Sequence, residues 1–308
     1  MTFTDWVEET RRQVRQDGWQ GVQDSAYKFY VGTFRRLGGV WNFGTPIYEE
    51  DWDMLVVLDA CRWDLMAEVA QEYDFVDEEW TYSVASSSAE WMEKNFRPSY
   101  AAEMARTAHV TANPYSEQKL DPQSFAYLEE VWKHTFDRDV RTIPARAVTD
   151  AAIRAGRERD HDRLLVHYMQ PHHPFVRKPL DKGIPRDEFS STPWDNVWHK
   201  LRRGQLEYEE VWDGYRDNLR YVLDDVALLL ENVDAERVLI TADHGNLLGE
   251  YGLYAHPDYV PLKPLKRVPK CVTSATDEET HTSDTDAETA TDVEEVSRDE
   301  QLKHLGYK

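Results

Sequence analysis

An aspartate and a histidine stand side by side at the end of an apolar run, as Asp243 and His244 followed by Gly245. A carboxylate oxygen and an imidazole nitrogen are ligands that suit a divalent metal ion such as zinc or manganese. Gly245 permits a tight backbone turn that can aim both side chains at one point. The same pair could instead be an aspartate that caps a turn beside a surface histidine, so the surrounding sequence has to decide.

A second acidic residue, Asp59, directly follows the continuous apolar run 54–58. Such a run is typical of a strand that is buried on both faces. A carboxylate at the mouth of a buried strand is costly unless it is paired or bound to a metal ion. Alternatively, Asp59 caps the helix that we expect at about 62–73. Arg62 is placed to orient Asp59 or to hold an anionic oxygen.

The elements that would have to position these residues alternate along the chain. Apolar runs predict strands at 54–58, 109–112, 164–169 and 237–242, and helical periodicity predicts helices at about 62–73, 89–96, 123–135, 145–158 and 211–230. Strands that alternate with helices predict an α/β fold with a mostly parallel central sheet and helices on both faces. In such sheets, ligands bind at the carboxyl ends of the strands. Asp59, Asp243 and the adjacent His172 and His173 all follow such ends.

Three ordered motifs and one helical segment together resemble the sulfatase branch of the alkaline phosphatase superfamily. The stretch 242–252, followed by His256, looks like that family's Asp-His-Gly segment, and 56–64 is similar to its first-strand motif. The stretch 170–175 is similar to its Pro-His-x-Pro segment, and 215–222 looks like the helix that precedes the Asp-His-Gly strand. The resemblance covers about residues 50–270, and between the motifs the chain matches only in pattern.

The resemblance implies a metal site and residues that act on a substrate. It implies one or two divalent ions (zinc, manganese, calcium or magnesium), with three ligands named above: Asp59, Asp243 and His244. It places His172 near the substrate, with His173 as the alternative. His256 would stabilise charge on the substrate or protonate its leaving group. Alternatively, His256 and a further carboxylate would hold a second metal ion.

The family's nucleophile opens a helix some tens of residues after the first aspartate, and the serines 86–88 occupy that place. Ser88 is the expected nucleophile, and Ser87 is the next candidate. At a helix N-terminus the hydroxyl would lie beside amide donors and the positive end of the helix dipole, which favours a phosphoryl or sulfuryl anion. The alternative is that these serines only cap the helix.

The cysteines bear on the type of ester. Sulfatases oxidise a cysteine within a Cys-x-Pro-x-Arg setting, but Cys61 lacks that proline and arginine, and no cysteine lies near Ser88 in the sequence. We therefore expect a metal-dependent hydrolase or transferase of phosphate esters that acts through a covalent serine intermediate. A sulfatase that hydrolyses sulfate esters and a non-catalytic, sulfatase-like binding protein are the alternatives.

The composition narrows the class of partner. The 308 residues include 58 Asp+Glu against 36 Lys+Arg, a net charge of −22. Such a field repels nucleic acid, so we expect a small anionic ester, free or carried on a glycan or lipid. A halophilic source would account for so acidic a surface. The sequence has no signal-peptide core near its start and no run of about twenty apolar residues that could span a bilayer, so the expected location is the cytoplasm.

The chain divides into four predicted parts. Residues 1–48 form an amphipathic helical segment that packs on its own domain, binds a partner or makes peripheral contact with a membrane. Residues 49–271 form the α/β domain, in which 178–204 is expected to be a lid or specificity loop. Residues 272–294 form an acidic disordered linker. Residues 295–308 form a short helix that docks back on the domain.

Overall fold

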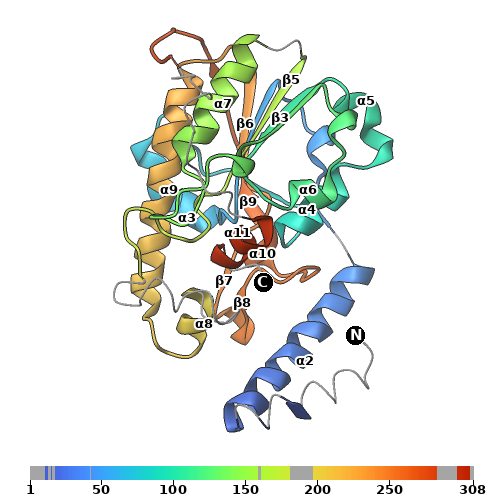
Figure 1. The fold of residues 1–308 in the computed structure, drawn as a ribbon, viewed down its shortest axis with the longest axis vertical. Coiled ribbons are helices and arrows are strands. Elements are labelled where there is room, and N and C mark those ends of the chain that lie inside the picture. Colours follow the sequence, from blue (N-terminus) through green and yellow to red (C-terminus); the bar gives the residue numbers. More distant parts are fainter. Residues whose placement is uncertain are drawn as a thin grey trace.

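Six strands form one sheet in the computed structural model, which describes residues 11–12, 15, 18–41, 43–158, 161–180, 197–282 and 297–305. The strands lie in the order β10–β6–β1–β5–β3–β4. Their bounds are β1 Met54–Leu58, β3 Thr107–Thr111, β4 Tyr127–Glu130, β5 Arg163–Tyr168, β6 Ala235–Thr241 and β10 Cys271–Ala275. The first five in chain order run parallel, and β10 pairs with β6 in the antiparallel direction. The predicted, mostly parallel sheet is confirmed (Figure 1).

Helices cover both faces of this sheet, as expected (Figure 1). Every second residue of β1, from Met54 to Leu58, shares a core with one set of helices: α3 Trp63–Val69, α7 Ala145–Glu158 and α9 Tyr208–Leu230. Leu55 and Val57 share the opposite core with α4 Ser88–Asn95 and α5 Ala101–Met104. Successive side chains of a strand point to opposite faces, so the all-apolar run of β1 is buried on both sides.

The remaining elements are short, apart from α2. The helices are α2 Trp19–Val40, α6 Ser116–Lys119, α8 Val197–Arg202, α10 Lys263–Lys266 and α11 Arg298–His304. Two small antiparallel pairs also form: β2 Trp80–Tyr82 with β9 Arg267–Pro269, and β7 Leu247–Leu248 with β8 Tyr254–Ala255. Single 3-10 turns lie at Ile47–Glu49, Ala70–Glu72, Pro98–Tyr100, Pro122–Ser124, Val131–Lys133 and Glu250–Gly252.

Two sequence predictions of local structure were wrong. The helix expected at 123–135 is instead two 3-10 turns around β4, because this segment pairs with the free edge of β3. The acidic linker expected from 272 begins inside β10, whose backbone pairs with the edge strand β6. Most of that linker, 283–294, lies outside the described residues. Both segments join the sheet at an edge through backbone hydrogen bonds, and the pattern of side chains in the sequence does not reveal such bonds.

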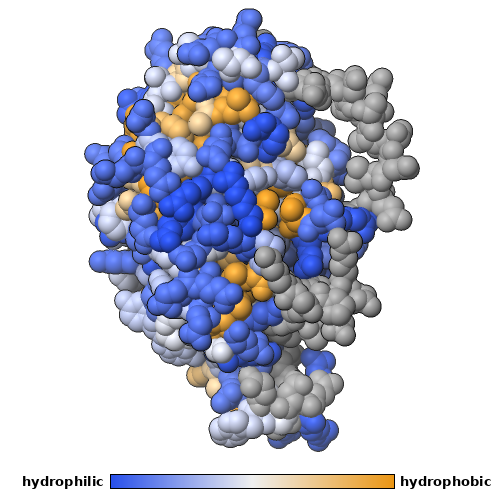
Figure 2. All heavy atoms as spheres, turned by 90° about the vertical axis from the view of Figure 1, so that its left-hand side faces the viewer, coloured by the Kyte–Doolittle hydropathy of each residue, from blue (hydrophilic) through white to orange (hydrophobic). Residues whose placement is uncertain are grey.

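Helix α2 lies at the β7–β8 end of the molecule, away from the central sheet (Figure 1). Its residues Tyr27, Val31 and Phe34 pack against a separate apolar cluster, Leu247, Leu253, Val260 and Leu265. At the other terminus α11 packs against the main body, with Leu302 and Leu305 fully buried. Among the described helices, none has the length and apolar character needed to cross a membrane. The side of the molecule that carries α9 is largely hydrophilic, with separate apolar patches (Figure 2).

The expected lid, 178–204, falls partly outside the described residues, which omit 181–196. Its described end forms α8, where Trp198 is buried against Phe175 and Tyr215. This end of the segment is therefore anchored in the core beside α9 rather than lying on the surface.

Candidate functional site

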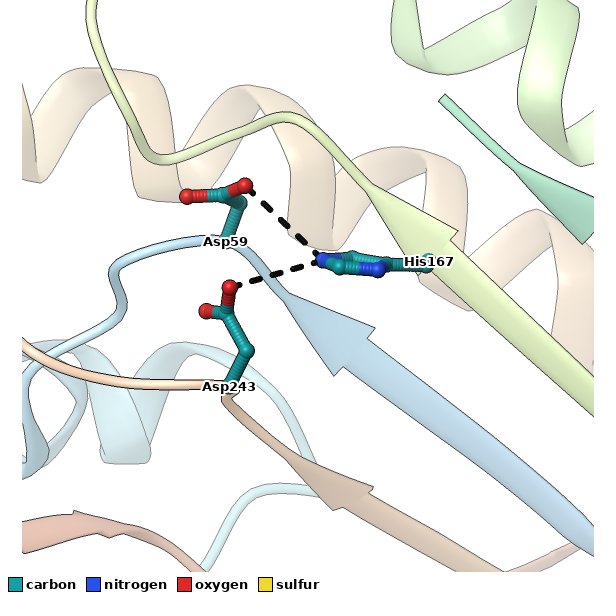
Figure 3. Close-up of side chains that lie close together, drawn as sticks. All are labelled: Asp59, His167 and Asp243. Atoms are coloured by element: carbon teal, nitrogen blue, oxygen red, sulfur yellow. Dashed lines mark ion pairs between the residues drawn. The ribbon is translucent and has the colours of Figure 1, made fainter. Parts of the chain in front are cut away.

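The register of three neighbouring strands brings three polar side chains to one face of the sheet. Val57 of β1 pairs with His167 of β5 on one side and with Thr241 of β6 on the other. Residues two apart on a strand share a face, so Asp59 and Asp243 continue the face that holds His167. Figure 3 shows both carboxylates directed at one nitrogen of the His167 ring. Nε2 of His167 lies 3.8 Å from Oδ2 of Asp59 and 3.7 Å from Oδ2 of Asp243.

Ser88 and His244 join this group. Helix α4 covers the same face, and Ser88 is its first residue. The Ser88 hydroxyl donates to Oδ2 of Asp59 at 3.1 Å and lies 3.2 Å from Nε2 of His244. That nitrogen is 3.7 Å from Oδ1 of Asp59 and 3.4 Å from Oδ2 of Asp243. All five side chains are buried, so two carboxylates, two imidazoles and a hydroxyl converge in a space closed to bulk water.

The backbone around the Asp-His-Gly turn holds these atoms in place. The amides of Ala60 and His244 donate to Oδ1 of Asp243 at 3.0 and 2.8 Å, which leaves Oδ2 to face the group. Nδ1 of His244 lies 2.7 Å from the carbonyl oxygen of Gly245, so Nδ1 carries the proton and Nε2 presents a lone pair. A Cβ on Gly245 would lie 2.1 Å from the carbonyl oxygen of Pro264. Glycine is therefore needed here for close backbone approach.

The donor atoms fit a divalent metal ion. Within the described part of the chain, neither Oδ2 of Asp243 nor either ring nitrogen of His167 has a hydrogen-bond partner. Tetrahedral ligands about 2.1 Å from a metal ion lie about 3.4 Å apart, close to the spacing of these atoms. Burial opposes ionisation of Asp243, but the neighbouring His244 and His167 outweigh it, so the pKa of this carboxyl is lowered. The group thus offers carboxylate oxygens and imidazole nitrogens, the donor types that zinc or manganese binds.

Sequence reasoning missed two members of this neighbourhood. His167 is the one histidine within the apolar run of β5, and a polar residue on a strand buried on both faces was a usable signal. Asn113 follows β3 by two residues and donates from Nδ2 to Oδ2 of Asp59 at 2.7 Å. A polar side chain just after a parallel strand was the signal for Asn113, the same signal that identified Asp59.

His172 and His256 face each other beside the group. Their Nε2 atoms are 2.9 Å apart, and the His256 ring stacks on that of His244 with centroids 4.7 Å apart. Nδ1 of His172 lies 2.5 Å from the carbonyl oxygen of His173 and therefore carries the proton of that ring. Burial, and then the neighbouring imidazole, hold the pKa of His172 and of His256 well below the usual value. Both rings are neutral near pH 7, and the proton between them belongs to His256.

The two alternative residues lie elsewhere. Ser87 is the N-cap of α4: its Oγ accepts from the amide of Glu90 at 3.4 Å and donates to Asp258 at 2.5 Å. The ring of His173 stacks with Trp198 at a centroid distance of 6.0 Å. Of the two serines, Ser88 lies beside Asp59 and His244, and of the two adjacent histidines, His172 lies beside His256. These two residues were the first choices from the sequence.

Arg62 does not make the contact expected of it. Its guanidinium donates to Asp64 at 2.6 and 2.8 Å, to Glu250 at 2.5 Å and to the carbonyl oxygen of Asn246 at 3.0 Å. These partners neutralise the cation, and Arg62 ties the start of α3 to the turn after the Asp-His-Gly segment. Asp59 is oriented instead by Asn113 and Ser88. The expectation that Arg62 orients Asp59 is therefore wrong, because adjacency in sequence does not determine the direction of a long side chain.

No family model matches this chain, and no curated protein matches it. Solved structures do match. One is the C-terminal periplasmic domain of phosphoethanolamine transferase EptC from Campylobacter jejuni, at 16% identity over 72% of this chain and 78% of that chain, with a TM-score of 0.47. Another is the corresponding domain from Escherichia coli in a complex with Zn, at 12% identity over 77% and 76%, with a TM-score of 0.48. A third is a 2-O GAG sulfatase, at 12% identity over 71% and 63%, with a TM-score of 0.46.

The chain is thus similar to solved structures of phosphoethanolamine transferases and of a sulfatase. Because the identities and TM-scores are low, the case for a function rests on the geometry of the site itself.

Proposed function

We propose that this protein is a metal-dependent hydrolase or transferase of phosphate esters that acts through a covalent intermediate on Ser88. The observation that carries the proposal is the place of the Ser88 hydroxyl, 3.1 Å from Asp59 and 3.2 Å from His244 at the start of α4. A serine that only capped the helix would not need two ionisable neighbours in a buried site. The cap is already supplied by Ser87.

Four side chains would hold the metal ion: Asp59, Asp243, His244 and His167. When bound, a divalent ion supplies positive charge that favours the alkoxide of Ser88 and neutralises the anionic ester. Sequence motifs suggested three of these ligands. Within the described residues neither nitrogen of the buried His167 ring has a hydrogen-bond partner, and Nε2 faces both carboxylates, which supports the fourth ligand.

The chain's own groups account for the proton movements. Asp59 accepts the hydrogen bond of the Ser88 hydroxyl and would take its proton as Oγ forms a bond to phosphorus. The bond from phosphorus to the leaving oxygen breaks, and that oxygen would take the proton on Nε2 of His256, while Nδ1 of the same ring takes a proton from water, so that the ring stays neutral. Water or an acceptor alcohol then displaces the serine oxygen, which takes its proton back from Asp59, and the proton that the water or alcohol loses passes to the solvent. The facing nitrogens of His172 and His256 would alternatively serve as ligands of a second ion.

The cysteines favour phosphate over sulfate esters. Burial raises the pKa of the Cys61 thiol well above its usual value, and its Sγ faces the carbonyl oxygen of Arg62 rather than the site. Cys271 is buried as well. We therefore infer that an unmodified serine, Ser88, is the nucleophile, which suits phosphoryl transfer. A lipid or glycan as carrier of the ester belongs to the same proposal.

The test is the activity of the purified protein on phosphate monoesters, phosphate diesters and sulfate esters with added zinc, manganese, calcium or magnesium. We expect metal-dependent cleavage of a phosphate ester and a trapped phosphoryl group on the peptide that contains Ser88, detected by mass spectrometry. Ser88→Ala should abolish both, with a loss of about a thousandfold or more. Ser87→Ala is the matched control, because it removes a cap and leaves the nucleophile. Metal-free protein whose activity is unchanged by Asp243→Ala would refute the proposal.

A further inference from the structure

Helix α2 presents an apolar stripe to solvent. Its exposed large side chains are Trp19 (75%), Phe29 (54%), Tyr30 (42%), Leu37 (55%) and Val40 (92%), and Trp41 (66%) follows directly. At 100° per residue the five helical positions fall within an arc of about 100°. A continuous apolar stripe of this kind on one side of a surface helix marks a site that contacts another protein or a membrane.

The other side of α2 is firmly attached to the molecule. The hydroxyl of Tyr27 accepts from the amide of Tyr254 at 3.0 Å, and Arg35 pairs with Asp258 at 2.8 Å. A Cβ on Gly38 would lie 1.9 Å from the carbonyl oxygen of Tyr259, so the helix backbone touches that loop. The stripe therefore faces outward because the opposite side of the helix is already occupied.

The charge of this region is opposite to that of the rest of the chain. Residues 11–41 contain six Lys and Arg against two Asp, a net charge of +4, whereas the remainder of the chain carries −26. Two copies of α2 placed face to face would bring like charges together, whereas an anionic surface would attract this region and repel the rest. The charge pattern thus favours an anionic partner over a second copy of the chain.

We propose that α2 docks this protein on an anionic lipid bilayer, with the stripe in the headgroup region and Arg36, an exposed residue beside the stripe, against a lipid phosphate. The 22 residues of α2 span about 33 Å, enough to lie in the plane of the surface, and tryptophans at both of its ends suit the interface. The partner that we propose is therefore a lipid surface with an apolar interior beneath negatively charged headgroups. This docking does not depend on the proposed enzymatic activity.

Docking would also orient the site. The loop that α2 contacts carries His256, and Asp258 on this loop joins Arg35 of α2 to the Ser87 hydroxyl. A bilayer against α2 would therefore lie on the side of the molecule where His256, the most exposed of the site histidines, is found. If the proposed function holds, lipid headgroups that carry a phosphate ester become the favoured substrate class, and this second step rests on that function.

The binding experiment uses the full chain and vesicles of phosphatidylcholine, alone or with about one third phosphatidylglycerol. We expect co-sedimentation with the anionic vesicles only, weakened by salt, together with a blue shift of tryptophan fluorescence. Leu37→Ser with Val40→Ser should lower the bound fraction at least tenfold, and so should Arg36→Glu. Val272→Ser, an exposed apolar residue on β10, is the matched control and should bind as the original chain does. Melting temperatures of all variants show that they remain folded.

Three outcomes would overturn the proposal. The first is that the original chain does not bind to anionic vesicles, and the second is that Leu37→Ser with Val40→Ser binds as well as the original chain. The third is a dimer in lipid-free solution that Leu37→Ser dissociates, because the stripe would then be a self-association surface. Hydrolysis of a soluble phosphate ester is measured in parallel. Loss of vesicle binding with unchanged hydrolysis separates failure of docking from failure of the proposed function.

Discussion

At the scale of single residues, position on a strand matters more than residue type. Asp59, Asp243 and His167 reach one point because β6, β1 and β5 are neighbours and their side chains lie in register. His109 of β3 lies on the same face of the sheet, two residues before Thr111, which pairs with His167. Yet His109 lies between the rings of Phe96 and Phe125 and has no hydrogen-bond partner within the described residues. The two buried histidines therefore have different expected roles.

His167→Gln should weaken metal binding. An amide cannot present the imidazole lone pair to the two carboxylates, so we expect the metal affinity to fall by about tenfold to a hundredfold. Calorimetric titration of the metal-free protein with zinc or manganese measures this without reference to activity. His109→Gln, one strand away, is the control and should keep the original affinity. Equal affinities for the original chain and His167→Gln would show that His167 is only a core residue.

His109 should make stability depend on pH. Burial, followed by the neighbouring His167, holds the pKa of His109 well below its usual value, so the ring is neutral in the folded state. Below about pH 6.5 the unfolded chain binds a proton that the folded chain does not, so the free energy of unfolding falls as pH falls, by at most about 1.4 kcal/mol per pH unit. His109→Leu removes this contribution.

The measurement is urea unfolding at pH 7.5 and 5.5 for both chains. As the pH falls from 7.5 to 5.5, the free energy of unfolding of His109→Leu should rise by about 1 kcal/mol relative to that of the original chain. The variant keeps every other histidine, so the difference isolates His109. A difference that is the same at both pH values would contradict the prediction.

At the scale of elements, helix α9 fixes the loop that carries His172. The side chain of Asn218 donates to the carbonyl oxygens of Pro171 and His172 at 3.0 Å each and to that of Pro174 at 3.4 Å. Its Oδ1 accepts from the amide of Val176 at 3.0 Å. One buried amide thus satisfies four backbone groups of a loop that no strand or helix would hold.

Asn218→Leu should loosen this loop. Leaving buried backbone groups without partners costs about 1–3 kcal/mol of stability, and the displaced His172 should lower the rate of phosphate ester cleavage. Asn232→Leu is the control, because Asn232 is an equally buried amide at the far end of α9, bonded to Leu228 and Thr280. Both variants should lose stability in urea unfolding, but only Asn218→Leu should lose activity. Equal activities would mean that Asn218 is purely structural.

At the scale of the whole molecule, the two buried carboxylates of the site affect the free energy of unfolding of the whole protein. Asp59 and Asp243 are completely buried where three strands end, in a chain with a net charge of −22. Two ionised carboxylates in such a place repel each other and lose hydration, unless a cation lies between them.

Removal of the proposed metal ion should therefore destabilise the whole protein. We expect prolonged treatment with a chelator to lower the melting temperature by several degrees, and added zinc or manganese to restore it. Differential scanning calorimetry measures both. The variant Asp243→Asn, which removes one of the two charges, should be less sensitive to the chelator. A melting temperature that is unchanged by chelation of the original chain, with metal removal verified by elemental analysis, would contradict this prediction.

The sequence by itself determined the class of fold and three residues of the site. Continuous apolar runs identified β1 and β6, and the polar residues after them, Asp59, Asp243 and His244, had to lie at the carboxyl edge of a parallel sheet. This worked because burial on both faces leaves a local signal in the chain, and strand ends leave another.

Only the tertiary structure decided which side chains meet. It placed Ser88 rather than Ser87 beside Asp59, directed Arg62 toward Glu250, and added His167 and Asn113 to the neighbourhood. It also drew β4 and β10 into the sheet. These outcomes depend on strand order, on register and on hydrogen bonds between segments far apart in the chain. Such interactions are not encoded in the local spacing of residue types, which is all that periodicity can report.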